Sequence, residues 1–465
     1  MERLYDRLKE YSKSDMYGFH MPGHKRNNKI MGIDLPYELD ITEIEGFDDL
    51  HHADGILKEE QERAARVFGA EETHFLVNGS TVGILSAILG STKKKDKVLI
   101  SRHCHKSVYH AVYMNELIPE YVYPQYDSTG QMNGETRVED IEAALENDDE
   151  IRAVIIVSPN YDGVVSDIKR IAEVVHAHDA VLIVDEAHGA HFGFHPYFPE
   201  RANSLGADVV INSLHKTLPS LTQTALLHIN GNRANREKIR KYLGILQTSS
   251  PSYIFMASLD ACVDLMEEKG SELFEEYAEN LKKIREDLAG LQHLKLLETD
   301  HFDPSKLVIS VADTKMKSLE LYKKLLCDYH LQMEMVAGTY VLAMTSLADT
   351  KEGYQRLKDA LFEIDAEAGE DLARGRILPK MERVLTPCEA IHCEEEGWSE
   401  EIPWRESEGR VALEFAYLYP PGSPVIVPGE KVSKESIKLL EYYEEQDFQI
   451  EGLGAKGKIK VWKNG

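Results

Sequence analysis

The apolar and polar residues of this chain follow two alternating periods, which together predict an α/β fold. Helical spacing of apolar residues predicts helices over residues 58–68, 81–89, 138–146 and 168–178. Short apolar runs predict strands over residues 73–77, 97–101, 151–158, 180–185 and 208–211. Strands separated by helices are typical of βαβ units. We therefore expect a mostly parallel central sheet.

The pattern changes after a long helix predicted over residues 252–290. Apolar segments then predict strands over 294–298, 305–311, 332–336 and 340–344, with a helix over 318–329. Residues 350–386 read as mainly helical, and Pro and Gly gather around residues 417–430. The first twelve residues predict an amphipathic helix followed by an irregular arm. We therefore predict an N-terminal arm (1–56), a large domain (57–290), a small α+β subdomain (291–370) and a C-terminal domain (371–465).

Composition excludes several classes of protein. The net charge is -27, from 80 acidic and 53 basic residues, which argues against a nucleic-acid partner. No apolar run has the length of a membrane span, and the charged first eight residues lack the apolar core of a signal peptide. The five cysteines are scattered without a Cys-x-x-Cys pair, so we expect neither disulfides nor a metal site. We expect a cytoplasmic protein without membrane partners.

One lysine and one aspartate together indicate a cofactor. Lys216 lies in the run Ser213–Ala225, just after a predicted strand, where its amine can form a Schiff base with the aldehyde of pyridoxal phosphate. A lone loop lysine is more often merely solvated. Asp185, however, ends the apolar run that begins at Val181, and ligands collect at the carboxyl ends of such strands. Its carboxylate can pair with a protonated pyridine nitrogen, although helix capping is the alternative role.

Two further segments complete the predicted cofactor site. Gly79, Ser80 and Thr81 lie between a strand and a helix, where hydroxyls and free N–H groups can bind a phosphate; an ordinary helix cap is the alternative. Ser213 can add another phosphate contact. After the next strand end, we choose His105 over His103 as a histidine that stacks on the pyridine ring, against the alternative of a polar loop residue.

The whole set of motifs resembles the fold-type-I, pyridoxal-phosphate-dependent Orn/Lys/Arg decarboxylase family, in its short bacterial form. The resemblance covers nearly the whole chain in order, through Phe19–Arg26, Asp40–Gly55, Asn78–Gly83, His103–Ser107, Asp185–His188, Ser213–Ala225 and Tyr419–Glu430. It implies an aspartate-aminotransferase-like large domain and α+β C-terminal subdomains. Around Thr386–Ala390, Cys388 stands where relatives often have arginine, which puts a shared C-terminal contact in doubt.

The resemblance also assigns roles to residues. Lys216 would hold the cofactor, Asp185 its pyridine nitrogen and His105 its ring, while His188 would flank it. Contacts to the cofactor would come from Gly79, Ser80, Thr81, Ser213 and His215. The distal cation of a basic substrate needs an acidic partner, and the candidates are Glu430 and the arm residues Glu43, Glu45, Asp48 and Asp49. His20 of the arm is a further candidate for substrate binding.

The implied reaction is decarboxylation of a basic amino acid to carbon dioxide and an amine of the polyamine pathway. Arginine is our first choice of substrate, before lysine and ornithine, and a homodimer or larger homo-oligomer is expected. Transamination or retro-aldol cleavage would use the same lysine and aspartate, so those residues alone do not separate the reactions. A third reading, from a different class, is a non-catalytic binding protein that retains the enzyme's shell.

Overall fold

The computed structural model describes residues 3–463 apart from residues 18, 28, 30, 31, 127–131, 370–376, 419–422, 455 and 456. The chain forms two compact units. Unit 1 comprises Met1–Ser91 and Val181–Glu275, and unit 2 comprises Thr92–Ala180 and Glu276–Gly465. The four domains expected from the sequence stay a prediction, and the boundary at residues 370 and 371 lies outside the described residues.

Unit 1 contains the N-terminal arm and half of the predicted large domain. Its elements are α1 (Leu4–Lys13), the 3-10 turns η1 (Tyr37–Leu39) and η2 (Leu50–His52), α3 (Ile56–Phe68), β1 (Glu72–Leu76), α4 (Gly79–Ser91), β5 (Val181–Asp185), η3 (Ala202–Leu205), β6 (Val209–Asn212), α8 (Leu214–Thr217), β7 (Ala225–Ile229), α9 (Arg236–Leu246) and the start of α10 (Tyr253–Leu288). The predicted helices and strands of this part are confirmed within a few residues.

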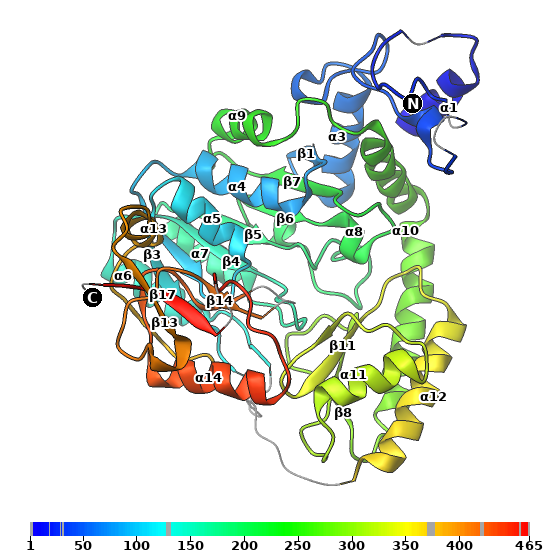
Figure 1. The fold of residues 1–465 in the computed structure, drawn as a ribbon. Helices are drawn as coiled ribbons and strands as arrows, with labels where there is room; N and C mark the ends of the chain where they lie inside the picture. The colour runs from blue at the N-terminus through cyan, green and yellow to red at the C-terminus, as the bar shows by residue number, and fades with distance from the viewer. Residues whose placement is uncertain are drawn as a thin grey trace. The chain divides into compact units, whose positions relative to one another are not determined.

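The strands of unit 1 follow the order β1-β7-β6-β5 (Figure 1). β5 and β6 are parallel, with Ile183 opposite Val209, whereas β7 runs antiparallel to both β6 and β1. Every residue of β5, β6 and β7 is buried. Burial on both faces explains why β5 and β6 read as continuous apolar runs rather than alternating ones. The strand β7 was not predicted from the sequence.

Helix α4 packs very closely onto this sheet because glycine occupies its contact face. A Cβ atom added at Gly83 would lie 2.7 Å from Leu76 Cδ1 and 3.3 Å from Ile211 Cγ2. One at Gly90 would lie 2.4 Å from Ile239 Cγ1 on α9. These approaches fix the N-terminus of α4 above the carboxyl end of β1, where the predicted phosphate contacts begin.

Helix α1 is held to unit 1 by two buried leucines and an acidic cluster. Leu4 and Leu8 are fully buried. The Leu4 N–H donates to Asp260 Oδ2 at 3.2 Å, and Arg63 forms buried ion pairs with both Asp260 and Asp264. The first part of the arm is therefore an integral piece of this unit.

Unit 2 contains the remaining strands of the predicted large domain and everything after it. In chain order its elements are β2 (Lys97–Ser101), α5 (Lys106–Met114), β3 (Ile118–Val122), α6 (Val138–Asn147), β4 (Ile151–Val157), α7 (Ile168–Ala177), the end of α10, β8 (Lys295–Leu297), β9 (Lys306–Ser310), α11 (Ser318–Cys327), β10 (Met335–Val336), β11 (Tyr340–Met344), α12 (Lys351–Ala368), β12 (Glu382–Arg383), α13 (Pro387–Glu395), β13 (Ser399–Pro403), η4 (Trp404–Glu406), β14 (Ala416–Tyr417), β15 (Pro424–Ile426), β16 (Glu430–Lys431), α14 (Lys434–Glu445) and β17 (Lys458–Trp462).

The sheets of unit 2 differ in direction. β2 pairs in parallel with β3 on one side and β4 on the other. β10-β11-β9-β8 form an antiparallel sheet, which confirms the predicted α+β pattern after residue 291. The expectation of mainly helical structure over 350–386 is only partly right, because α12 ends at Ala368 and β12 occupies Glu382–Arg383.

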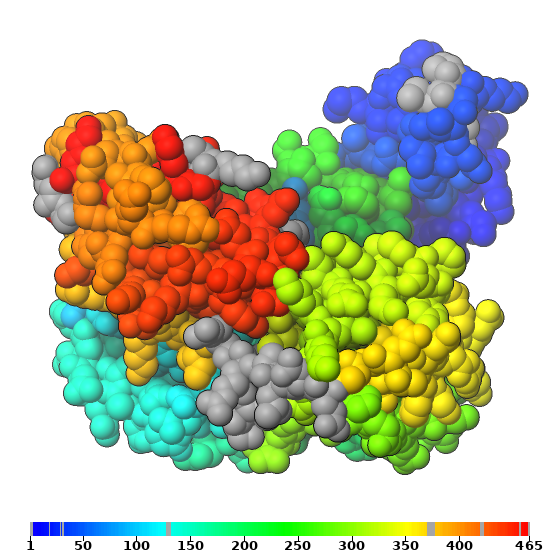
Figure 2. All heavy atoms as spheres, turned by 60° about the horizontal axis from the view of Figure 1, so that its bottom comes forward, coloured from blue at the N-terminus to red at the C-terminus, as the bar shows by residue number. Residues whose placement is uncertain are grey.

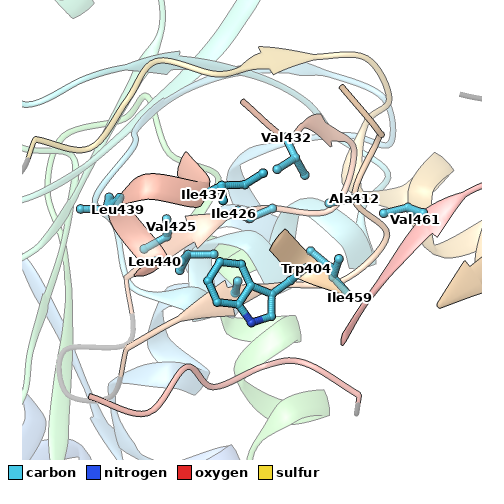
Figure 3. Close-up of a cluster of buried hydrophobic side chains, with 11 residues drawn as sticks. Trp404, Ala412, Val425, Ile426, Val432, Ile437, Leu439, Leu440, Ile459 and Val461 are labelled. Atoms are coloured by element: carbon cyan, nitrogen blue, oxygen red, sulfur yellow. The ribbon is translucent and has the colours of Figure 1, made fainter. Parts of the chain in front are cut away.

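The C-terminal part of unit 2 has its own apolar core. Trp404 packs with side chains from several short elements (Figure 3), namely Ala412, Ala416, Val425, Ile426, Val432, Ile437, Leu439, Leu440, Ile459 and Val461. Residues of α14 lie against the α+β part of the same unit (Figure 2), where Tyr442 Oη donates to the carbonyl of Gly338 at 3.4 Å. Across the residues that the structure describes, no helix is both long and apolar enough to cross a bilayer.

Candidate active site

Lys216 and His188 meet at the carboxyl ends of two neighbouring strands of unit 1. β5 leads into the turn that carries His188, and β6 leads through Ser213 into the short helix α8 that carries Lys216. Lys216 Nζ lies 3.0 Å from His188 Nε2. His188 is buried, with 5% of its surface exposed. The carboxyl ends of parallel strands lie at the same edge of a sheet, which brings these two residues together although they are 28 positions apart in the chain.

Asp185 is the last residue of β5 and is buried on the same edge. Its Oδ1 accepts a hydrogen bond from the Ala187 N–H at 3.2 Å. Burial raises the pKa of Asp185, and the positive charge of Lys216 opposes that rise. A buried carboxylate under the field of a lysine is suited to pairing with a cationic ring nitrogen.

The serines predicted as phosphate ligands come together. Ser80 Oγ, in the first turn of α4, lies 2.5 Å from Ser213 Oγ, which precedes α8. Thr81 is exposed in the same turn. Gly79 has a φ of +73°, and a Cβ atom added there would meet nothing within 4 Å, so open space adjoins this helix terminus. Two hydroxyls beside the N-terminus of a 13-residue helix fit an anion.

His215 has a fixed tautomer. Its Nδ1 lies 2.9 Å from the Thr224 carbonyl, and a carbonyl only accepts, so Nδ1 carries the proton and Nε2 has a free lone pair. Burial lowers the pKa of His215, with a further contribution from the charge of Lys216. The ring is therefore neutral near pH 7.

Sequence reasoning missed a clamp between the two strand ends. The buried carboxylate of Glu186 accepts hydrogen bonds from Asn212 Nδ2 at 3.0 Å and from the Ala202 N–H at 2.8 Å. Asn212 Nδ2 also reaches the Glu186 carbonyl at 3.1 Å. Glu186 directly follows Asp185, and Asn212 directly precedes Ser213. The clamp therefore sets the spacing between the aspartate and the lysine segment, and no sequence signal marks it beyond an acid next to Asp185.

In unit 2, His105 and His103 follow the end of β2 in different environments. His105 caps α5, since its Nδ1 accepts from the Ser107 N–H at 3.3 Å. An accepting Nδ1 leaves the proton of the neutral ring on Nε2. His103 is buried, its Nδ1 lies 3.0 Å from Ser101 Oγ, and burial lowers its pKa to about 4. Because His105 caps α5, its ring is held in a defined orientation, as a residue that stacks on another ring requires.

Glu430 is not placed as a free acid. Its carboxylate accepts two hydrogen bonds from the guanidinium of Arg102, at 3.1 and 2.8 Å, and one from the Val427 N–H at 2.9 Å. The Glu430 side chain is 1% exposed. The expected contact between Glu430 and the distal cation of a substrate stays untested, and this geometry offers a different role for the residue.

The acidic candidates of the arm are also engaged with the backbone. The Asp48 carboxylate accepts from four N–H groups, those of Asp49, Asp54, Gly55 and Leu57, at 2.8 to 3.1 Å. Burial acts to raise the pKa of Asp48, but these four donors outweigh it and lower the pKa.

The other arm candidates differ in their surroundings. Asp49 accepts from the His51 N–H and lies 3.0 Å from His52 Nδ1. Glu45 is exposed, whereas Glu43 Oε1 is buried without a hydrogen-bond partner among the described residues. Among the described residues, Glu43 is thus an arm carboxylate with one buried oxygen that no hydrogen bond satisfies. His20 Nε2 lies 3.0 Å from the hydroxyl of Tyr11 on α1.

The architecture has the fold of known fold-type-I structures. A lysine decarboxylase of Francisella novicida superposes with a TM-score of 0.83 at 20% identity, covering 98% of this chain and 80% of that one. An alanine–glyoxylate aminotransferase from Nostoc superposes with a TM-score of 0.55 at 15% identity, over 66% and 86% of the two chains. The expected aminotransferase-like α/β fold is confirmed.

The family follows from the sequence itself. Residues 3–322 match the major domain of Orn/Lys/Arg decarboxylases, and residues 371–454 match the C-terminal domain of the same enzymes. An arginine decarboxylase of Bacillus subtilis is 30% identical over 459 residues, covering 94% of this chain and 92% of that protein. The chain belongs to the Orn/Lys/Arg decarboxylase family and is an amino-acid decarboxylase, as the motifs indicated.

Proposed function

We propose that this enzyme removes the α-carboxylate of arginine, with pyridoxal phosphate bound covalently to Lys216. The observation that carries the proposal is the arrangement at the carboxyl ends of β5 and β6, where Lys216, His188 and Asp185 lie on one edge of unit 1. Arginine is placed before lysine and ornithine because several relatives that match nearly the whole chain at 28–30% identity are named arginine decarboxylases. The expected products are agmatine and carbon dioxide.

The residues present fit the proposed cofactor. Ser80 and Ser213, together with the exposed Thr81 and the space beside Gly79, would hold the phosphate at the N-terminus of α4. Asp185 would face the ring nitrogen. His105 and His215 would contact the ring and its surroundings, as the family resemblance implies. When bound, the cofactor supplies an electron sink for the electron pair that the departing carboxylate leaves behind.

The protein's own groups hold and move protons around that chemistry. Buried Asp185 keeps a cationic partner protonated, because separating the two charges in a low-dielectric site is costly. His188 fixes the Lys216 amine through its Nε2, so that the amine is positioned to give and take a proton. His215, neutral and hydrogen-bonded to the Thr224 carbonyl, anchors the short helix α8 that carries Lys216.

We also propose that the enzyme is a homodimer, with the arm at the interface. Large apolar side chains stand exposed on the arm, with Phe19 at 90%, Tyr17 at 74% and Met21 at 66%. Several exposed large apolar side chains close together in one segment are typical of surfaces that another molecule covers. A Phe19→Asp variant should dissociate in light scattering coupled to gel filtration, whereas Ile377→Asp, a change at another exposed apolar residue, should not.

The proposed location is the cytoplasm. All five cysteines, Cys104, Cys262, Cys327, Cys388 and Cys393, are free thiols. Free thiols without a disulfide are usual in reducing compartments.

The test of the proposed function is direct. Purified enzyme supplied with pyridoxal phosphate is incubated with arginine, lysine or ornithine, while carbon dioxide and amine are both measured. Release of both from arginine, with the highest kcat/KM of the three, supports the proposal. Amino-group transfer to an added keto acid without carbon dioxide would overturn it in favour of transamination.

The covalent link is tested separately. Borohydride reduction followed by peptide mapping should mark Lys216 in the wild type and nothing in Lys216→Ala. Failure to label, with no absorbance band of bound cofactor, would favour a non-catalytic binding protein.

A further inference from the structure

A buried ion pair links the C-terminal domain to the turn that carries His105. The turn is residues 101–105, between β2 and α5. Arg102 within it is fully buried, and its guanidinium directs all five of its N–H groups at the C-terminal residues or at Tyr109. Nε and Nη2 donate to Glu430 at 3.1 and 2.8 Å. Nη1 donates to the Pro424 carbonyl at 2.7 Å and to Tyr109 Oη at 3.3 Å, and Nη2 also reaches the Val425 carbonyl at 3.3 Å.

The backbone of the turn is held at the same place. The Arg102 N–H donates to the Val122 carbonyl at 2.8 Å, and Tyr109 Oη donates to the Arg102 carbonyl at 2.7 Å. The hydroxyl of Ser423 donates to the His103 carbonyl at 3.0 Å. The residues just before His105 are therefore fixed by contacts that come largely from residues 423–430.

The geometry of the Arg102–Glu430 pair favours a positioning role for Glu430 over binding of a ligand by its carboxylate. A bidentate arginine–carboxylate pair sets orientation as well as distance. Glu430 also receives the Val427 N–H, which leaves its carboxylate with three donors inside the protein. A carboxylate engaged in this way would have to release Arg102, a fully buried charge, before it could bind an outside cation.

We propose that Glu430, acting through Arg102, is a positioning residue that orients His105. The inference rests on the proposed function, in which His105 contacts the ring. It replaces the role of substrate contact that the sequence suggested for Glu430.

The experiment compares Glu430→Gln, Arg102→Lys and His105→Ala, and the double variant Glu430→Gln/His105→Ala, as full-length enzymes loaded with pyridoxal phosphate. The readouts are visible circular dichroism of the bound cofactor, its dissociation constant, and kcat and KM for arginine. We expect Glu430→Gln and Arg102→Lys to weaken the dichroism and to lower kcat about tenfold or more, because small misplacements of positioned groups are costly. The KM for arginine should change less than about threefold, since no substrate contact is lost.

The double variant distinguishes action through His105 from action elsewhere. If Glu430 works through His105, adding Glu430→Gln to His105→Ala should cause little further loss. Full additivity of the two changes would overturn the inference. So would a large rise in KM for Glu430→Gln with an unchanged cofactor spectrum, which is the result expected of a substrate contact.

Controls separate positioning from folding and from the proposed function. Glu414→Gln changes another carboxylate of the C-terminal domain, which accepts from the Gly454 and Lys460 N–H groups but does not touch the turn, and it should leave the dichroism unchanged. The double variant Arg102→Met/Glu430→Met removes both charges at similar volume, so no unpaired charge is left buried. It serves as the test if Glu430→Gln alone does not fold. Recovery of wild-type kcat in that variant would overturn the inference.

An unchanged cofactor spectrum in His105→Ala would remove the role of His105 in the proposed function, and this inference with it. By contrast, if the cofactor spectrum changed in His105→Ala but not in Glu430→Gln, the inference would be overturned while the proposed function would stand.

Discussion

The side-chain nitrogen of Lys216 lies 3.0 Å from Nε2 of His188, and the two residues follow neighbouring parallel strands. The imidazole of His188 therefore helps to orient the amine of Lys216. His188 is buried, with 5% of its surface exposed.

Replacing His188 should slow turnover more than it weakens binding. His188→Phe keeps a ring but removes Nε2, and we expect kcat to fall about a hundredfold, within the range for a positioned acid–base group. His188→Gln, which retains a hydrogen-bonding group, should recover part of the loss. Steady-state kinetics across pH measure both. A kcat within twofold of the wild type in His188→Phe would show that the contact has no catalytic consequence.

Asp185 should matter for chemistry more than for stability. Asp185→Asn keeps an acceptor for the Ala187 N–H but loses the negative charge, so the fold should persist. We expect kcat to fall about a hundredfold or more, because a charge that stabilises the transition state is lost. Thermal unfolding of the same variant supplies the control, and near-normal turnover would contradict the electron-sink role.

Glu186 should make the stability of unit 1 depend on pH. Burial raises the pKa of Glu186 from 4.5 to about 7, so the folded protein binds a proton that the unfolded chain releases between these values. The free energy of unfolding should therefore fall as pH rises from about 4.5 to 7, by on the order of 3 kcal/mol.

A glutamine at position 186 resembles the protonated acid. Glu186→Gln should flatten this pH dependence and be more stable than the wild type above pH 7, if the amide of Asn212 turns its unpartnered Oδ1 toward the new donor. Urea unfolding at several pH values measures the effect, with the exposed Glu173→Gln as a matched control. Parallel curves for wild type and Glu186→Gln would show that Glu186 does not carry the proton.

Asp48 should act as a structural cap rather than a substrate contact. Asp48→Ala removes the acceptor for four N–H groups near the start of α3 and should lower the free energy of unfolding by about 2 kcal/mol, the upper range for a capping residue. Because the pKa of Asp48 is lowered, the stability it contributes is present above its ordinary pKa and is lost as pH falls below it. Chemical unfolding tests this, and a raised KM for arginine with unchanged stability would assign Asp48 to the substrate instead.

The elements that locate the site were predictable because their sequence patterns are local. Val181–Val184 and Val209–Ile211 are buried on both faces, so each reads as an apolar run. Asp185 follows the first run directly, and Lys216 lies in the short helix that follows the second. β3 was missed because Pro119 and Glu120 interrupt its apolar pattern at the edge of its sheet.

The supporting residues were not predictable because their partners are distant. Glu186 finds Asn212 26 residues away, and Arg102 finds Glu430 328 residues away. A charged residue reads as surface until such a partner is known. The sequence shows the charge of Glu430 but not the arginine that pairs with it, and its predicted contact with a substrate stays a prediction.

Adjacent acids at positions 185 and 186 have a consequence for how this chain can change. Successive side chains at a strand end project to opposite sides, so the shorter acid serves the ligand edge while the longer one spans to Asn212 and the Ala202 N–H. If the two acids were exchanged, the side chain at position 186 would be one methylene too short to reach Asn212 and the Ala202 N–H. The side chain at position 185 would be one methylene longer and would crowd the ligand edge. A change of length at either position would therefore disturb the surroundings of both acids, so the two side-chain lengths are tied to each other by the fold.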